Sequence, residues 1–317
     1  MRVPLHIAFI LLFPFLSSAQ NWELGVTLGA SNYLGDIGSG KGSERPFVLD
    51  LQERYTKACL GLYGRYYTNG NLAFRANLIY GQLSGDDKLV DYWPRRLRNL
   101  SFRTNILELS GQVEYNFLSS KNVRYRELSQ NFRRTIVIAE RSLYAFVGVG
   151  VFHFNPTAEL DGVRYNLQTF GTEGQVDECP PNDATCTEKY NRVAINIPMG
   201  LGIQYLVDKE YRVGFEIGWR KLFTDYIDDI SNVYADPNLI AQNNGNGDDG
   251  ATAVALAQRC HEVTNENFWL LQCGEGSIRG HGYHLDSYFF TVITVGYMIK
   301  TAGIDCPKYE KDRFHLF

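Results

Sequence analysis

Few side chains in this sequence have the types and spacing that catalysis needs. A serine hydrolase requires a serine, a histidine and an acid close together, and His153 has no serine in the adjoining sequence. Other histidines lie near two cysteines, at spacings that match no zinc pattern: His261, His281, His284, Cys260 and Cys273. The sequence therefore predicts neither an enzyme nor a cofactor.

Two acidic stretches carry oxygen ligands that calcium would accept. One contains Asp225, Asp228 and Asp229, and the other spans residues 244–249. An EF-hand loop needs glycine at its sixth position and a final glutamate, and residues 244–249 lack both. We interpret that stretch as a soluble, flexible loop tip. No metal site is expected, and Asp225, Asp228 and Asp229 are kept as weak calcium candidates.

Six cysteines in an exported chain predict disulfides. Cys179 and Cys186 are close in sequence, and so are Cys260 and Cys273; both pairs fall in polar stretches typical of loops. We predict these two disulfides. Cys59 and Cys306 are left without an evident partner, so each is either a free thiol or forms an intermolecular bond.

Seven charged residues occupy alternate positions within strand-like segments. They fall on the face opposite the apolar side chains, which would place them in a barrel lumen. Buried charges without partners would cost several kcal/mol each, so we expect them to pair. A structural plug is the simpler interpretation, and a proton or ion pathway is the alternative. The seven residues are Glu23, Arg65, Arg75, Glu108, Glu114, Glu216 and Arg220.

The elements that would position these charges are eight segments with period-two hydrophobicity. Leu107, Leu109 and Val113, for example, alternate with Glu108 and Ser110. One face would meet lipid and the other the lumen, as in a membrane barrel. The last segment is apolar on both faces and alternates poorly. The segments span residues 22–31, 60–66, 72–80, 107–117, 143–152, 193–204, 213–220 and 288–299.

Composition agrees with this pattern without proving it. The chain has 30 Gly, 20 Tyr and 19 Phe but only 3 Met, which fits a barrel with interfacial tyrosines and a crowded lumen. A secreted β-sandwich would have a similar composition. The 31 basic and 35 acidic residues nearly cancel, so bulk charge does not suggest nucleic acid as a partner.

The first nineteen residues resemble a secretory signal peptide. Arg2 is followed by a short apolar run at 7–16 and by Ser17-Ser18-Ala19, which suits cleavage before Gln20. That run is too short for a membrane helix, which needs roughly 20 residues. We therefore expect a signal peptide at 1–19, a barrel at 20–299 and a C-terminal tail at 300–317.

Loop lengths favour a membrane barrel over a sandwich. Asn69-Gly70 predicts a type I′ hairpin, and Asp208-Lys209-Glu210 is a second tight turn. Four other connections are long and polar, and all four would lie on the extracellular side if the N-terminus is periplasmic. The predicted fold is all-β: an eight-stranded antiparallel transmembrane β-barrel in the outer membrane. The long connections are 34–56, 83–104, 155–190 and 225–285.

One connection on the periplasmic side is too long to be a simple turn. Residues 118–142 form a basic insertion, and the tail at 300–317 extends from the same side. The insertion is either a segment that faces phospholipid headgroups or a docking element for a periplasmic partner. The candidate partner-binding residues are Arg124, Arg126, Arg133, Arg134, Cys306 and Lys308.

Three stretches carry a family resemblance. They are Glu23-Leu24-Gly25 leading to Asn32-Tyr33-Leu34-Gly35-Asp36-Ile37, then Phe223-Thr224-Asp225-Tyr226-Ile227-Asp228-Asp229-Ile230-Ser231, and Asp286-Ser287-Tyr288-Phe289-Phe290. Through these stretches the chain resembles the PorG-like outer-membrane barrels of the Bacteroidetes type IX secretion system. The resemblance implies a non-enzymatic component of the secretion and gliding machinery, which anchors a periplasmic ring of a lipoprotein and its partner (PorK and PorN, or GldK and GldN).

Two other functions stay open on the sequence. The disulfide-braced loops at 155–190 and 231–285 would suit a surface barrel that binds an extracellular protein or polysaccharide. A lipid-modifying enzyme would depend on His153. The resemblance, and not the residue pattern, ranks the secretion role first.

Overall fold

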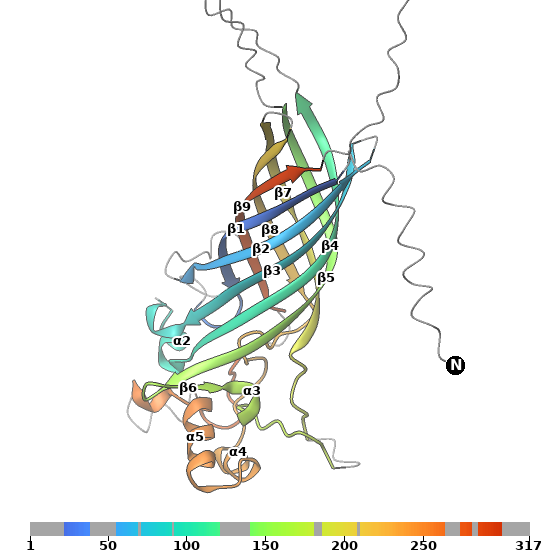
Figure 1. Ribbon diagram of the computed structural model, residues 1–317. Helices are drawn as coiled ribbons and strands as arrows, with labels where there is room; N and C mark the ends of the chain where they lie inside the picture. Colours follow the sequence, from blue (N-terminus) through green and yellow to red (C-terminus); the bar gives the residue numbers. More distant parts are fainter. Residues whose placement is uncertain are drawn as a thin grey trace, which may run out of the picture.

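The chain folds into a closed antiparallel β-barrel (Figure 1). The computed structural model describes residues 22–38, 55–68, 71–90, 92–120, 140–180, 186–207, 210–263, 273–280 and 285–299. Among these residues, no helix is long and apolar enough to cross a membrane.

Eight strands form the barrel wall, and each pairs antiparallel with its two neighbours. The ring closes where β1 pairs with β9, and β4 pairs with β5 within it. The predicted fold class is confirmed. The wall strands are β1 (Trp22–Leu34), β2 (Lys57–Tyr67), β3 (Leu72–Asp86), β4 (Ser101–Ser120), β5 (Glu140–Leu160), β7 (Val193–Val207), β8 (Tyr211–Leu222) and β9 (Ser287–Met298).

The period-two pattern of the sequence produces an apolar belt around the wall. On β4, Leu109 is 57% exposed while its neighbour Glu108 is fully buried. Outward apolar side chains continue from Leu107 to Phe117. At about 3.4 Å per residue and a tilt of about 40°, this belt is about 26 Å tall, which matches the hydrocarbon thickness that barrels span.

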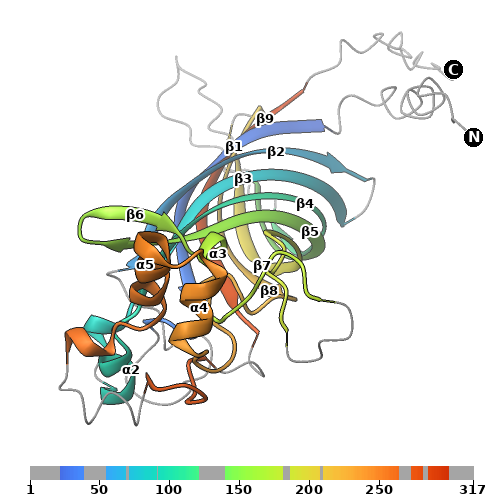
Figure 2. The same ribbon diagram turned by 90° about the horizontal axis from the view of Figure 1, so that it is seen from below.

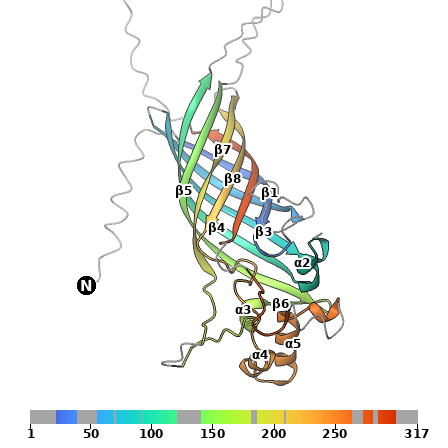
Figure 3. The ribbon, with the colours of Figure 1, turned by 180° about the vertical axis from the view of Figure 1, so that it is seen from behind.

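Three strands continue well past the belt, which the sequence did not predict. β3 extends to Asp86, β4 starts at Ser101, and β5 reaches Leu160, where it forms a hairpin with the short strand β6 (Val163–Asn166) (Figures 1 and 3). The connections expected at 83–104 and 155–190 are therefore shorter, and His153 does not end its strand. Beyond the belt the outward positions are polar, so backbone pairing continues without an apolar alternation to mark it.

The ends of the barrel differ. We call the end with the four long connections the loop end and the other the turn end. At the turn end, β4 ends at Ser120 and β5 begins at Glu140, so the insertion expected at 118–142 is partly strand. Residues 1–19, 121–139 and 300–317 lie outside the described part, and the predictions made for them stay predictions.

Short helices gather at the loop end (Figures 1 and 2). They are η4 (Asp87–Leu89), α2 (Trp93–Arg98), α3 (Leu167–Phe170), α4 (Pro237–Asn243), α5 (Gly247–Ala257) and η5 (Cys260–Glu262). Helices α4 and α5 pack through Ile240, Ala253 and Ala257, all buried. The stretch at 244–249, expected as a loop tip, contains the start of α5. We call the described parts of the long connections the loop cap: residues 35–38, 55–56, 87–90, 92–100, 161–180, 186–192, 223–263, 273–280 and 285–286.

Candidate functional site in the lumen and the loop cap

The structure places all seven inward charges inside the barrel, each at most 2% exposed. Glu23 pairs with Arg65 at 2.8 Å, and Arg65 pairs with Glu114 at 2.9 Å. Arg75 then bridges Glu114, at 3.3 Å, and Glu216, at 2.5 Å. Alternating signs follow one another across the lumen, so each buried charge has a counter-charge.

One member of this network was missed in the sequence. Arg212 on β8 lies 3.1 Å from Glu23, at an inward position that shares the parity of Glu216. The predicted segment began one residue later, which excluded it. With Arg212 included, three arginines (Arg65, Arg75 and Arg212) face three glutamates in this group, and its charge is balanced.

A second, separate pair lies nearer the loop end. Arg220 lies 3.4 Å from Glu108, which also accepts hydrogen bonds from Tyr288 at 2.7 Å and Asn196 at 2.9 Å. Cys59 on β2 is buried and faces the lumen by the alternation of its strand, and its register partner Gly81 has no side chain, which leaves room for Phe290 beside it. Cys59 is a free thiol enclosed by the barrel, so it has no route to an intermolecular disulfide.

Tyrosines complete the packing of the lumen. Tyr63 donates to Glu23 at 2.6 Å, and Tyr144 donates to Glu216 at 2.9 Å. A Cβ atom at Gly202 would collide with the ring of Tyr144. The small residue on β7 therefore makes room for the large one on β5, and side chains fill the lumen.

Two buried arginines tie the four long connections together. Arg98 pairs with Asp87 at 2.7 Å and donates to the carbonyls of Asp36 at 2.7 Å and Arg279 at 2.5 Å. Arg279 in turn pairs with Glu173 at 3.1 Å and donates to the carbonyl of Asp229 at 2.9 Å. The loop cap is thus one bonded unit. No periodicity in the sequence indicated either arginine.

The three stretches that carry the family resemblance meet at one point of the loop cap. The hydroxyl of Tyr33 lies 2.6 Å from Asp228 Oδ2 and 2.7 Å from Asp286 Oδ1, and it accepts the amide of Asp36 at 3.0 Å. Asp228 also accepts the amide of Ile37 at 3.2 Å. Each of the three stretches, which are far apart in sequence, contributes at least one residue to this cluster.

Burial sets the acidity of the cluster. Removal from water raises the pKa of Asp228 well above its ordinary value, and the nearby carboxylate of Asp36 adds to the effect. The pKa of Asp286 is raised well above its usual range by burial and then by Asp228. Burial also raises the pKa of Asp225 to about 7. Protons, rather than counter-charges, therefore neutralise part of this acidic group near neutral pH.

The weak calcium candidates are not brought together. Asp228 faces Tyr33, whereas Asp229 turns to the hydroxyls of Thr172 and Tyr190 and toward Arg279. Burial raises the pKa of Asp229 to about 6, against the opposing effect of Arg279. Within the described residues, no three His, Cys, Asp or Glu side chains are grouped so that they could hold a metal ion.

The remaining predicted residues divide between the loop cap and undescribed segments. Cys179 bonds to Cys186, and Cys260 to Cys273, both within the loop cap. His153 is exposed on the outward face of β5, between Leu107 and Val193 in register. The other predicted residues lie outside the described part: Arg124, Arg126, Arg133, Arg134, His281, His284, Cys306 and Lys308.

Comparisons with known proteins do not assign a function to this chain. A family model described as a domain of unknown function (DUF6089) matches residues 2–131, which is less than half of the chain. No curated protein matches.

Several solved outer-membrane proteins are similar at low scores. Ail, the attachment invasion locus protein of Yersinia pestis, solved with the heparin analogue sucrose octasulfate, has TM-score 0.34 and 8% identity, covering 87% of this chain and 98% of Ail. Neisserial surface protein A has TM-score 0.34 and 7% identity, covering 88% and 97%. OprG from Pseudomonas aeruginosa has TM-score 0.33 and 8% identity, covering 89% and 97%. The architecture of this chain rests on its own strand pairing.

Proposed function

We propose that this chain is a closed outer-membrane barrel that anchors a periplasmic lipoprotein ring of the type IX secretion and gliding machinery. The observation that carries the proposal is the cluster formed by Tyr33, Asp228 and Asp286. These residues come from the three stretches that resemble the PorG-like family, and in this chain the three stretches meet at one point.

The apolar belt supports the outer-membrane location. The belt is about 26 Å thick along the barrel axis, which matches the hydrocarbon layer of a bilayer. Closed barrels are the β-structures that cross bilayers, because they leave no unpaired strand edge. A signal peptide, expected at residues 1–19, would deliver the chain to the periplasm for insertion.

The filled lumen supports an anchoring role over transport. Arg75 pairs with Glu114 and Glu216 and lies over the ring of Tyr63, so side chains occupy the lumen at its level, as expected for a barrel that does not conduct solutes. A barrel that does not transport solutes would interact with its partners through the segments at its two ends. The ring would be held at the turn end, where the basic insertion and the tail leave the wall.

The test is recovery of the ring proteins with designed variants. Because β4 ends at Ser120 and β5 begins at Glu140, residues 121–139 are replaced by Asn-Gly without shortening a strand, and the chain is truncated after residue 300. We expect affinity purification of this variant to lose the lipoprotein and its partner. The matched control, Cys179→Ser with Cys186→Ser, alters only the loop end and should keep both. Full recovery with the doubly shortened variant contradicts the proposal.

A second function is favoured by one observation at the opposite end. The loop cap is held by buried ion pairs and two disulfides, yet it presents exposed apolar side chains, including Trp93 at 51% and Ile278 at 66%. Apolar side chains on a rigid scaffold suit an extracellular partner. Trp93→Ala with Ile278→Ser would abolish binding of a surface partner while leaving secretion normal, if this function holds.

A further inference from the structure

The outward face of β3, β4 and β5 changes from apolar to polar just above the belt. Along β4, Leu107 is the last apolar outward residue, Asn105 follows, and Arg103 is next; Arg103 is exposed. The neighbouring strands also carry polar outward residues at the levels of Asn105 and Arg103. Their register partners are Tyr80, Gln82 and Ser84 on β3, and His153, Asn155 and Thr157 on β5.

Arg103 lies just beyond the layer of lipid headgroups. From Leu107 to Arg103 the chain rises about 13 Å along the strand, or about 10 Å along the membrane normal at a tilt of about 40°. The polar layer on each side of a bilayer is about 5 to 8 Å thick. An arginine at this height reaches back into that layer with its long side chain.

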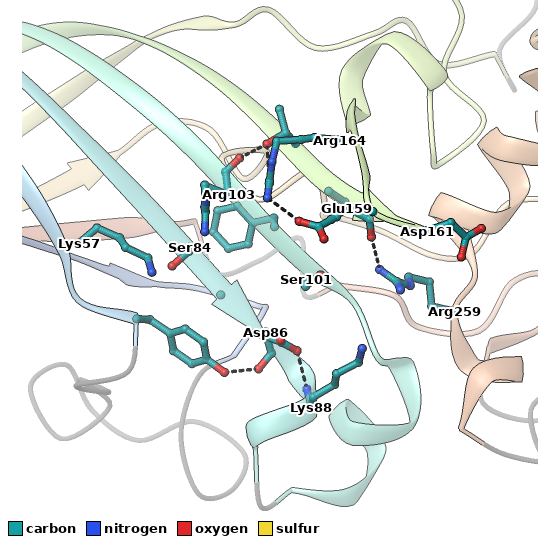
Figure 4. Close-up of a pocket in the computed structure, with 16 residues that line it drawn as sticks. Lys57, Ser84, Asp86, Lys88, Ser101, Arg103, Glu159, Asp161, Arg164 and Arg259 are labelled. Carbon is teal, nitrogen blue, oxygen red and sulfur yellow. Dashed lines mark hydrogen bonds and ion pairs between the residues drawn. The ribbon is translucent and has the colours of Figure 1, made fainter.

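A polar hollow of about 440 Å³ opens on this face (Figure 4). Residues from the ends of β3, β4 and β5, the hairpin strand β6 and the start of β2 line it. A volume of this size suits one small polar group such as a sugar ring with its substituents. The hollow contains five basic side chains against three acidic ones: Lys57, Lys88, Arg103, Arg164 and Arg259, with Asp86, Glu159 and Asp161.

Two of the five cations are already engaged within the protein. Arg164 pairs with Glu159 at 2.9 Å, and Arg259 pairs with Glu262 at 2.8 Å while donating to the carbonyl of Glu159 at 3.0 Å. These bonds fix one wall of the hollow. Their charges are balanced, so they add little attraction for an anion.

Lys57, Lys88 and Arg103 remain to attract a ligand, against the carboxylates of Asp86 and Asp161, so the hollow keeps a net positive charge. Among the described residues, no carboxylate lies within ion-pair distance of the side-chain nitrogens of Lys57, Lys88 or Arg103. Hydroxyl groups of Ser84 and Ser101 lie in the same hollow. Arginine and lysine beside hydroxyls form the donor set that binds phosphate oxygens.

We propose that this hollow binds the phosphorylated sugar of an outer-leaflet glycolipid, whose acyl chains lie along Tyr80 and Leu107. Charge complementarity selects a phosphate, and the apolar belt directly below selects a lipid over a free anion. The proposal rests on the outer-membrane location given under the proposed function, but not on the ring. Bound lipid would fix the tilt and depth of the barrel on the side of β3 to β5.

The experiment measures binding of diphosphoryl lipid A to the full mature chain inserted in phosphatidylcholine vesicles. The test variant is Lys57→Gln with Arg103→Gln. The matched control is Arg96→Gln with Lys221→Gln, which removes the same charge from exposed sites outside the hollow. We expect the test variant to lose affinity by about tenfold or more, since each charged hydrogen bond contributes about that factor. The control should bind as the wild type does.

Inorganic phosphate at millimolar concentration should not displace the lipid. Equal affinity of the test variant and the control overturns the proposal, and so does full displacement by inorganic phosphate, which would mark an anion site without lipid selection. A chain that does not insert into vesicles contradicts the outer-membrane location itself. Ring recovery with Lys57→Gln and Arg103→Gln is expected to be normal, so the two proposals fail separately.

Discussion

Asp228 and Asp286, from two separate connections, share the single hydroxyl of Tyr33, at 2.6 Å and 2.7 Å. A phenol has one proton, so it donates to only one of the two carboxyl groups. At these distances the other carboxyl group donates its own proton to the phenol oxygen. A carboxylic acid that keeps its proton therefore links the two connections through Tyr33, and the raised pKa values of both aspartates agree with this.

The first prediction concerns pH. A carboxyl group with a pKa above its unfolded value of about 3.9 binds more protons when folded. Its contribution to stability is therefore greatest at low pH and falls as pH rises toward the folded pKa. Because the pKa of folded Asp225 is about 7, its contribution should be lost between about pH 4 and pH 7, and the raised pKa values of Asp228 and Asp286 act in the same direction, so the loop cap should loosen as pH rises.

Hydrogen exchange measures this effect directly. The amides of Ile37, Ile227 and Ile230 donate to the two aspartates. After correction for intrinsic rates, they should be less protected at pH 8 than at pH 5.5, and Asp228→Asn should reduce the difference. Protection that increases with pH would contradict the shared proton.

The second prediction concerns the lumen network. Arg75→Met leaves Glu114 and Glu216 without their shared counter-charge and should lower the free energy of unfolding by about 3 to 5 kcal/mol. Urea unfolding of the barrel in vesicles gives this value. The exposed Arg96→Met serves as control and should stay within about 0.5 kcal/mol. Equal effects of the two variants would show that the network does not stabilise the fold.

A third prediction compares two glycines in the wall. Gly202 has the Tyr144 ring where a Cβ atom would go, whereas Gly111 has nothing within 4 Å. Gly202→Ala should therefore destabilise the barrel by about 1 to 3 kcal/mol, and Gly111→Ala should be neutral or slightly stabilising. The same urea series reports both. A neutral Gly202→Ala would mean that the lumen is packed less tightly than described.

The fourth prediction concerns Cys59, which is 4% exposed inside the wall. In a Cys306→Ser background, maleimide should not react with the folded, inserted barrel and should label one thiol after unfolding. Rapid labelling of the folded protein would indicate that solvent reaches the lumen, which would contradict the description of a lumen filled by side chains.

The barrel wall was predictable because one physical signal repeats along it. Glu108 and Arg220 were assigned to the lumen by alternation alone, and they pair there at 3.4 Å. Arg212 was not predicted to face the lumen, because the predicted strand segment began one residue later, at Val213. Hydrophobicity alternates along a strand only where one face of the strand meets lipid. The alternation therefore stops where the apolar belt ends, and the sequence pattern did not predict the extensions of β3 and β5 beyond it.

The loop cap was largely unpredictable for the same reason. Arg98 and Arg279 lie in stretches without period, and their partners Asp36, Asp87 and Glu173 come from three other parts of the sequence. Within the loop cap, only the two disulfides could be predicted from the sequence, because their cysteines are close in sequence and a short loop brings its ends together. The convergence of Tyr33, Asp228 and Asp286 needed the closed ring that joins β1 to β9.

Cross-linking in native membranes, followed by mass spectrometry, tests the anchoring claim most directly. The account predicts that Lys121, which follows β4 in the sequence, and Lys308, in the C-terminal tail, cross-link to the lipoprotein ring, whereas Lys57 and Lys88 at the loop end do not. Ring cross-links from Lys57 or Lys88, with none from Lys121 or Lys308, would contradict it.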